Sequence, residues 1–406
     1  MAAKSTDVSL SDVLGLGRLA ADAATGLTDL VAQMHTSILD TPGPFGPLGR
    51  GLTGGVTRLA YRGVRGAFRL TGAGLGFAHA RLGADQQDAM TSRGRDIALA
   101  ALNGVLGDHL AETGNPLALR MRLRHHDRTL ILDKGELAEA FPNATGRVAV
   151  FVHGLCMSDR QWTRHNHDHG AALAHDLGFT PVYLSYNSGL HVSVNGRVFA
   201  EMLEALIEEW PRPINEFVVI GHSMGGLVAR SACQYGEAGG QRWRRQLRKL
   251  VFLGTPHHGA PLERIGNWVD HVVTKTPYTA AFAKLGKVRS AGVTDLRYGN
   301  LVDEDWQGRD RFAREPDKRR AIPLPEGVAC YAIAGTTASS AGDLIDRLVG
   351  DGLVPVGSAL GHHKDPARAL AFPADRQAVA SSTGHLDLLS RRDVYEQIAR
   401  WLSQSR

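Results

Sequence analysis

The sequence contains few cysteines and no long apolar run, and both absences narrow the class of protein. The three cysteines (Cys156, Cys233 and Cys330) are odd in number, far apart and outside any CxxC arrangement. A disulfide framework is therefore not expected, and a reducing compartment is favoured. No run approaches the ~20 apolar residues that span a bilayer, and the N-terminus lacks the basic and apolar regions of a secretory signal. We expect a cytoplasmic protein whose contact with membranes, if there is one, is peripheral.

Acidic residues are missing between residues 40 and 85, where six arginines occur. If 52–71 is a helix, four of these arginines form one narrow stripe opposite an apolar face. Two interpretations of the region 50–82 stay open: a basic amphipathic helix on an anionic lipid surface, or a helix whose Gly63 and Ala67 pack against another helix. The stripe consists of Arg58, Arg62, Arg65 and Arg69.

The net charge of +5 is too small to indicate a nucleic-acid partner.

The composition changes near residue 115. Residues 1–115 are rich in Gly, Ala, Leu and Arg and have helix-like spacing, so we predict a helical N-terminal extension. From Leu117 the sequence "LALRMRLR" alternates like a strand, and "RTLIL" after "HHD" is its predicted hairpin partner. Buried-strand runs then alternate with helix-length segments, which predicts an α/β domain over 116–406 with a mostly parallel sheet flanked by helices. The stretch of about 259–325 interrupts this rhythm and is the predicted inserted cap.

The run "FVVIGHSMGGLVAR" combines a GxSxG pattern with a preceding apolar strand and a following helix. This strand–turn–helix context predicts a serine, Ser223, at the tip of a strained elbow. Gly221 and Gly225 are expected where the turn brings backbones too close for a side chain, and Gly226 where the helix approaches the sheet. The helix N-terminus then directs its free amides at the serine oxygen.

A nucleophilic serine needs a general base and a carboxylate that orients the base. On a fold of this kind the chain order is serine, then acid, then histidine. "GDGLVPV" supplies Asp351 on a glycine-flanked loop, and "STGHLDLL" supplies His385 before the last helix. Asp343 and Asp346 lie in the same region and are the competing acids.

The chain contains 18 histidines, so the choice of His385 depends on position. His222 lies inside the elbow and is expected to point away from the site. His257 and His258 follow the fourth strand, too early for the base, and His153 ends the first strand of the α/β series. The alternating histidines of "RHNHDHG" lack cysteines or a carboxylate cluster at ligand spacing, so we predict a polar helix start there and no metal site.

Together these motifs resemble the α/β-hydrolase-fold lipases and esterases, specifically the PGAP1-type (GPI inositol-deacylase-like) group. The matching pieces, in chain order, are "VFVHGLCMSDRQW", "YNSGLHVSVNGR", "VVIGHSMGGLVAR", "LVFLGTPHHGAP", "DGLVP" and "GHLDLL". The resemblance implies hydrolysis of an ester or lipid substrate through an acyl-serine intermediate, without a redox cofactor. It also places the oxyanion-binding backbone amides on Leu155 and Met224. Nothing in the resemblance reaches residues 1–115.

The resemblance leaves some questions open. Some related lipases bind calcium through the aspartate two residues after the histidine, here Asp387; its partner carboxylate is not identifiable, so a salt bridge or a helix-start role is expected. Acyl transfer to a non-water acceptor uses the same triad and is an alternative to hydrolysis. A lipid-surface-binding protein on a hydrolase scaffold is a second alternative, which a complete Ser–Asp–His set disfavours. For the cap, an acyl-binding lid and a solvated charged loop over packed aromatics both stay open.

Overall fold

The computed structural model divides into two compact units. One consists of 1–91 with 110–118, and the other of 92–109 with 119–406. The predicted arginine stripe and its helix over 52–71 lie outside the described residues. In the part of the chain that is described, no helix combines the length and apolar character that crossing a bilayer requires. The described residues are 17, 93–126, 128–261, 289–313, 316–339 and 350–404.

The second unit is built on an eight-stranded sheet with the strand order β2-β1-β4-β3-β5-β6-β7-β8. The strands are β1 (Arg122–His125), β2 (Arg128–Thr129), β3 (Arg147–Val152), β4 (Thr180–Ser185), β5 (Glu216–His222), β6 (Leu247–Leu253), β7 (Ala329–Gly335) and β8 (Gln377–Ala380). The described α-helices are α3 (Arg93–Glu112), α4 (Lys134–Ala140), α5 (His169–Leu177), α6 (Val192–Glu209), α7 (Met224–Ala238), α8 (Arg242–Gln246), α10 (Ala291–Asp295), α12 (Val356–Ala359) and α13 (Arg392–Ser403).

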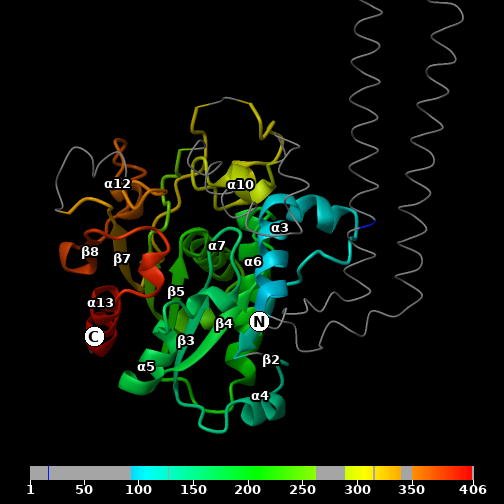
Figure 1. Cartoon of the computed structure of the whole chain (residues 1–406), viewed down its shortest axis with the longest axis vertical. Coiled ribbons are helices and arrows are strands. Elements are labelled where there is room, and N and C mark those ends of the chain that lie inside the picture. Colours follow the sequence, from blue (N-terminus) through cyan, green and yellow to red (C-terminus); the bar gives the residue numbers. More distant parts are fainter. Residues whose placement is uncertain are drawn as a thin grey trace, which may run out of the picture. The chain divides into compact units, whose positions relative to one another are not determined.

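Helices cover both faces of the central strands, as β3 illustrates. Val148, Val150 and Val152 belong to one hydrophobic cluster, whereas Ala149 and Phe151 belong to another. The first cluster includes side chains of α6 and α7, and the second includes side chains of α5 and α13 (Figure 1). All five side chains are fully buried. Burial of a phenylalanine side chain such as that of Phe151 contributes roughly 1.5–3 kcal/mol to the free energy of folding. This two-sided burial explains why the strands are continuous apolar runs in the sequence.

The strand pairing confirms the predicted mostly parallel α/β fold. Strands β3 to β8 run parallel to one another, whereas β1 pairs antiparallel with both β4 and β2. The β1–β2 pairing is the predicted hairpin, shorter than its sequence pattern suggested. Strand β8 was not predicted because its four residues, "QAVA", are only partly buried at the sheet edge and form no apolar run.

Candidate active site

Ser223 joins the end of β5 to the start of α7 in a strained turn. Its backbone has φ 54° and ψ −126°, a region that non-glycine residues rarely adopt and that costs of order 1–3 kcal/mol. The Ser223 amide donates a 2.8 Å hydrogen bond to the Leu253 carbonyl at the end of β6, which holds the turn against the neighbouring strand. The predicted elbow conformation is therefore present.

Three glycines make the elbow sterically feasible. A Cβ added to Gly221 would lie 2.6 Å from the Gly226 Cα, and one added to Gly225 would lie 2.2 Å from the Val152 carbonyl oxygen. A Cβ on Gly226 would lie 2.0 Å from Thr255 Oγ1, so this glycine lets α7 approach the segment after β6. All three distances are below 3.0 Å, and the predicted roles of the glycines are confirmed.

Asp351 and His385 contact each other in the interior. His385 Nδ1 lies 2.7 Å from Asp351 Oδ2, and the two side chains are only 5% and 1% exposed. The other carboxylate oxygen accepts hydrogen bonds from the Leu353 and Val354 amides, and the His385 amide donates to the Asp351 carbonyl. Because a carboxylate accepts from Nδ1–H, the other ring nitrogen, Nε2, is the unprotonated one in the neutral imidazole. The competing acids, at positions 343 and 346, lie outside the described residues.

The Nε2 atom of His385 is buried and makes no hydrogen bond to any described residue, Ser223 included. A catalytic hydrogen bond is often long in an enzyme without substrate and tightens when substrate binds. A Cβ added to Gly254 would lie 3.0 Å from Asp351 Oδ2 and 3.3 Å from His385 Cε1. Gly254, the residue after β6, therefore packs closely against the Asp351–His385 pair.

The expectation that His222 points away from the site was wrong. Its ring centroid lies 4.7 Å from that of His385, and its Nε2 lies 3.0 Å from the His385 carbonyl oxygen. Because a carbonyl only accepts, His222 Nε2 is the donor. Burial lowers the pKa of His222 well below its usual value, so this ring is neutral and adds no charge beside His385. His222, the residue before the serine, therefore contacts both the ring and the backbone carbonyl of His385. No local sequence pattern indicated this contact.

The loop after β3 lies directly against the serine. A Cβ added to Gly154 would be 3.0 Å from Ser223 Cβ, so Leu155 follows a residue in contact with the elbow. The amide of Met224 is the first of α7 and, like other first-turn amides, has no partner within its helix. No hydrogen bond donated by the Leu155 amide occurs within the described part of the chain. Both predicted oxyanion amides thus belong to backbone that adjoins Ser223.

The remaining histidines of interest have structural surroundings. His153 is buried, its Nδ1 lies 2.9 Å from the Gly154 carbonyl oxygen, and its ring stacks on Tyr186. In "RHNHDHG", Asp168 caps the N-terminus of α5 and His169 contacts the Leu388 carbonyl, as a polar helix start predicts. Among the described residues, no group of three or more His, Cys, Asp or Glu is arranged to hold a metal ion.

Asp387 takes part in local contacts after His385. One carboxylate oxygen lies 3.8 Å from Arg164 in an ion pair, and the other accepts a hydrogen bond from the Gly384 amide. Both partners of the ion pair are about a third or more exposed, so this pair contributes little to stability. Of the two alternatives predicted for Asp387, the salt bridge is confirmed.

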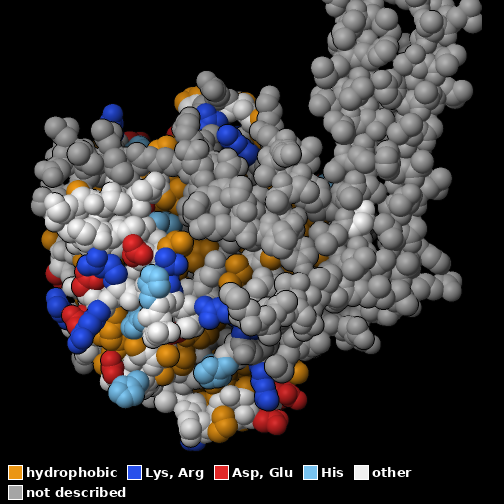
Figure 2. Space-filling model, viewed as in Figure 1, with side chains coloured by type: hydrophobic (Ala, Val, Ile, Leu, Met, Phe, Trp, Pro, Cys, Tyr) orange, Lys and Arg blue, Asp and Glu red, His pale blue; other side chains and the backbone are white. Residues whose placement is uncertain are grey.

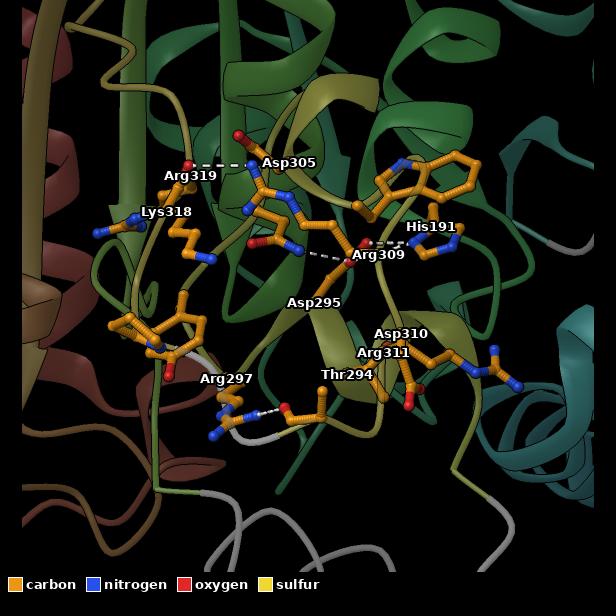
Figure 3. Close-up of a pocket in the computed structure, with 15 residues that line it drawn as sticks. His191, Thr294, Asp295, Arg297, Asp305, Arg309, Asp310, Arg311, Lys318 and Arg319 are labelled. Carbon is orange, nitrogen blue, oxygen red and sulfur yellow. Dashed lines mark hydrogen bonds and ion pairs between the residues drawn. The ribbon is translucent and has the colours of Figure 1, made fainter.

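The cap contributes α10 to the surroundings of the elbow. A Cβ added to Gly292 would lie 3.0 Å from Met224 Cε, so α10 covers the residue after the serine. Beside α10 lies a cavity of about 70 Å³, where His191 Nδ1 lies within hydrogen-bonding distance of the Asp295 carboxylate, at 3.1 Å (Figure 3). Trp306, also in its lining, stacks on His191 at 3.7 Å. A larger cavity of about 630 Å³ shares Thr294, Arg297, Tyr298 and Arg311 with this lining and is also lined by Phe312 and Pro355.

Both interpretations of the cap find support in its described part. Trp306 packs under the loop, with its Nε1 donating to Ser193 Oγ, whereas Phe312 of the basic run is 57% exposed. Figure 2 shows Lys and Arg side chains at the top of the view, over the loop coloured yellow in Figure 1. The aromatics at positions 268, 278 and 282 lie outside the described residues, so the acyl-binding lid stays a prediction.

One family model matches part of the chain. Residues 143–322 match the family model described as the PGAP1-like alpha/beta domain. None of the curated proteins compared with the chain matches it significantly.

Among solved structures, the mature lipase BlEst2 of Bacillus licheniformis is 18% identical, with 63% of this chain and 91% of that chain covered and a TM-score of 0.40. The esterase Pf2001 of Pyrococcus furiosus is 13% identical, with 64% and 83% covered and a TM-score of 0.38. The phospholipase PlaB of Legionella pneumophila is 17% identical, with 52% and 45% covered and a TM-score of 0.34. Similarity at this level carries no information on substrate. The family match confirms the resemblance that the motifs indicated: residues 143–322, which contain β3 to β6 and the Ser223 elbow, are similar to the PGAP1-like alpha/beta domain.

Proposed function

We propose that the protein is a serine carboxylic-ester hydrolase of the lipase and esterase type, with Ser223, His385 and Asp351 as its catalytic triad. The observation that carries the proposal is the buried 2.7 Å contact between His385 Nδ1 and Asp351 Oδ2, in the same site as a serine at φ 54°. A buried carboxylate paired with an imidazole is costly to desolvate unless both groups are well bonded. A strained serine likewise costs free energy, and the two features together support a reactive site.

In the proposed reaction, His385 Nε2 takes the Ser223 hydroxyl proton while Oγ attacks the ester carbonyl carbon. The carbonyl π electrons move to the oxygen, and the amides of Leu155 and Met224 stabilise this oxyanion by about 3–4 kcal/mol each. The tetrahedral intermediate collapses as His385 gives its proton to the leaving alcohol, which forms an acyl-serine. A water, deprotonated by His385, then attacks the acyl carbon. The bond between this carbon and Ser223 Oγ breaks, His385 returns the proton to Oγ, and the acid is released. Asp351 fixes the imidazole tautomer and stabilises the imidazolium.

The proposal is tested with the Ser223→Ala variant of the full chain. We expect it to lose hydrolysis of a chromogenic short-chain ester and covalent labelling by a fluorophosphonate, because both need the Oγ nucleophile. The matched control is Ser403→Ala, at the exposed end of α13, which should keep both. Retained activity in Ser223→Ala would overturn the assignment, and an acyl product on an added alcohol would identify acyl transfer as the alternative outcome.

The proposal extends to location. The three cysteines are buried and unpaired, which supports a reducing, cytoplasmic compartment. Peripheral contact with anionic lipid through residues 50–82 rests on the arginine stripe alone. A full-length variant with all four stripe arginines changed to glutamine should sediment less with anionic vesicles than the original chain. Equal sedimentation would remove the lipid-contact proposal and leave the hydrolase proposal intact.

A further inference from the structure

A small cavity between α7, the loop after β6 and the segment around residue 320 is lined by an unusual set of side chains. Its volume is about 20 Å³, whereas about 10–15 Å³ suffices for one water molecule, so it has room for a single small particle. Four of the described lining residues are arginines, two are histidines and none is acidic. These six residues are Arg230, Arg319, Arg320, Arg368, His257 and His258.

Arg230 extends from α7 into this region and is only 3% exposed. One terminal nitrogen lies 3.3 Å from His257 Nδ1, and the other donates to the Ile322 carbonyl. Its Nε–H is buried without an acceptor, and no described carboxylate pairs with the guanidinium. Burial and the neighbouring Arg319 lower the pKa of Arg230 to about 10, so the group is charged at neutral pH. A buried cation without a counter-ion is among the most expensive arrangements in a folded protein.

His257 supplies a second donor without an acceptor. A guanidinium only donates, so His257 Nδ1 accepts from Arg230 and the ring proton sits on Nε2. This Nε2–H is buried and has no hydrogen-bond partner. Burial also lowers the pKa of His257 well below its usual value, so the ring is a neutral donor. Two orphaned N–H groups, one of them charged, thus come from two different lining residues.

The neighbouring charges do not supply the missing negative group. Arg319 and Arg368 both pair with Asp317, at 3.1 Å and 3.2 Å, and Arg368 also pairs with Asp365 at 3.6 Å. Arg320 pairs at 3.6 Å with the exposed Glu304. The nearby buried carboxylate of Asp305 accepts from backbone amides of residues 301, 302 and 320. None of these carboxylates pairs with Arg230, so its guanidinium has no ion-pair partner among the described residues.

We propose that this cavity binds one small inorganic anion of the halide class, chloride being the abundant example. The anion would accept from Arg230 Nε–H and His257 Nε2–H and would neutralise the buried guanidinium. A water molecule would accept the same hydrogen bonds but would leave the charge uncompensated. Oxyanions such as phosphate are too large for the volume. The bound anion would join α7, which begins at the residue after Ser223, to the loop after β6.

The direct test is a crystal of the full chain grown or soaked in bromide, a halide with a strong anomalous signal. We expect an anomalous peak within hydrogen-bonding distance of Arg230 Nε and His257 Nε2. In parallel, thermal unfolding is compared in chloride and in gluconate at equal ionic strength. Chloride at 100 times its dissociation constant should shift the unfolding equilibrium about 100-fold toward the folded state, which raises the midpoint temperature by a few degrees.

The variants separate this site from general salt effects. Arg230→Met and His257→Phe should abolish the difference between chloride and gluconate, whereas Arg400→Met, on the exposed end of α13, should keep it. If Arg230→Met does not fold, His257→Phe and the anomalous map of the unchanged protein still decide. A water-only density with no anomalous peak, or identical midpoints in the two salts, would overturn the proposal. Esterase activity is not needed for either readout, so this result is independent of the proposed function.

Discussion

Replacing Asp351 by asparagine changes one atom type at the centre of the proposed triad. The Asp351 Oδ1 atom accepts from the Leu353 and Val354 amides at 3.0 Å and 2.8 Å, and an asparagine oxygen can keep both bonds. The asparagine NH₂ then occupies the place of Oδ2 and faces His385 Nδ1. Because NH₂ only donates, Nδ1 must accept, and the ring proton moves to Nε2. That nitrogen can no longer take the proton of Ser223.

The expected loss follows from this change of tautomer. In a comparable serine hydrolase the same substitution lowers kcat by about 10,000-fold, which corresponds to about 5–6 kcal/mol of transition-state stabilisation. We expect a loss of this order in kcat for a chromogenic short-chain ester, with KM nearly unchanged because no substrate contact is removed. Thermal unfolding should shift little, since both amide bonds to Oδ1 are kept.

The control for this substitution is Asp375→Asn, at an exposed carboxylate before β8, which should retain full activity. An Asp351→Asn enzyme within about tenfold of the original kcat would refute the reasoning. In that case another acid would have to orient His385. A variant that is inactive and also unfolded by circular dichroism would contradict the expectation that the substitution leaves the loop intact.

Three further expectations concern the surroundings of the triad. Gly225→Ala forces a Cβ to within 2.2 Å of the Val152 carbonyl oxygen, and we expect a loss of roughly 3 kcal/mol or more in urea unfolding; Gly94→Ala, whose Cβ would meet nothing within 4 Å, should not destabilise. His222→Leu removes the donor to the buried His385 carbonyl and should lower kcat more than it raises KM. His222→Gln, which retains an N–H donor, should recover part of the lost kcat. Stability should fall as pH drops from 6.5 toward 4, because burial lowers the pKa of His153 to about 4 and the unfolded chain therefore binds this proton first. The loss approaches about 3 kcal/mol over that window, and urea unfolding at pH 7 and pH 4.5 measures it.

The sequence predicted the parts of the site that local geometry dictates. The elbow needs a strand, glycines two residues either side of the serine and a helix, all within about a dozen residues, so a short pattern sufficed. Asp351 and His385 were predicted from chain order and glycine-flanked loops, and the structure brings these two side chains together. What the sequence could not predict are contacts that depend on the packing of distant segments. The Nε2 bond of His222 to the carbonyl at residue 385 spans 163 positions, and no local pattern indicates it.

The same distinction separates chemistry from substrate choice. The carboxyl edge of a parallel sheet gathers the loops after several strands, so the segments that carry the proposed nucleophile, base and acid all lie at this edge. The cap is fixed by individual long-range contacts, such as the stack of Trp306 on His191 and the ion pair of Arg311 with Asp108. Substitutions in these contacts should therefore change which ester is preferred while the elbow and the Asp351–His385 pair stay intact. The test measures hydrolysis rates of Trp306→Ala on esters of different acyl-chain lengths. A profile identical to that of the original protein at every length would show that Trp306 does not determine which ester is preferred.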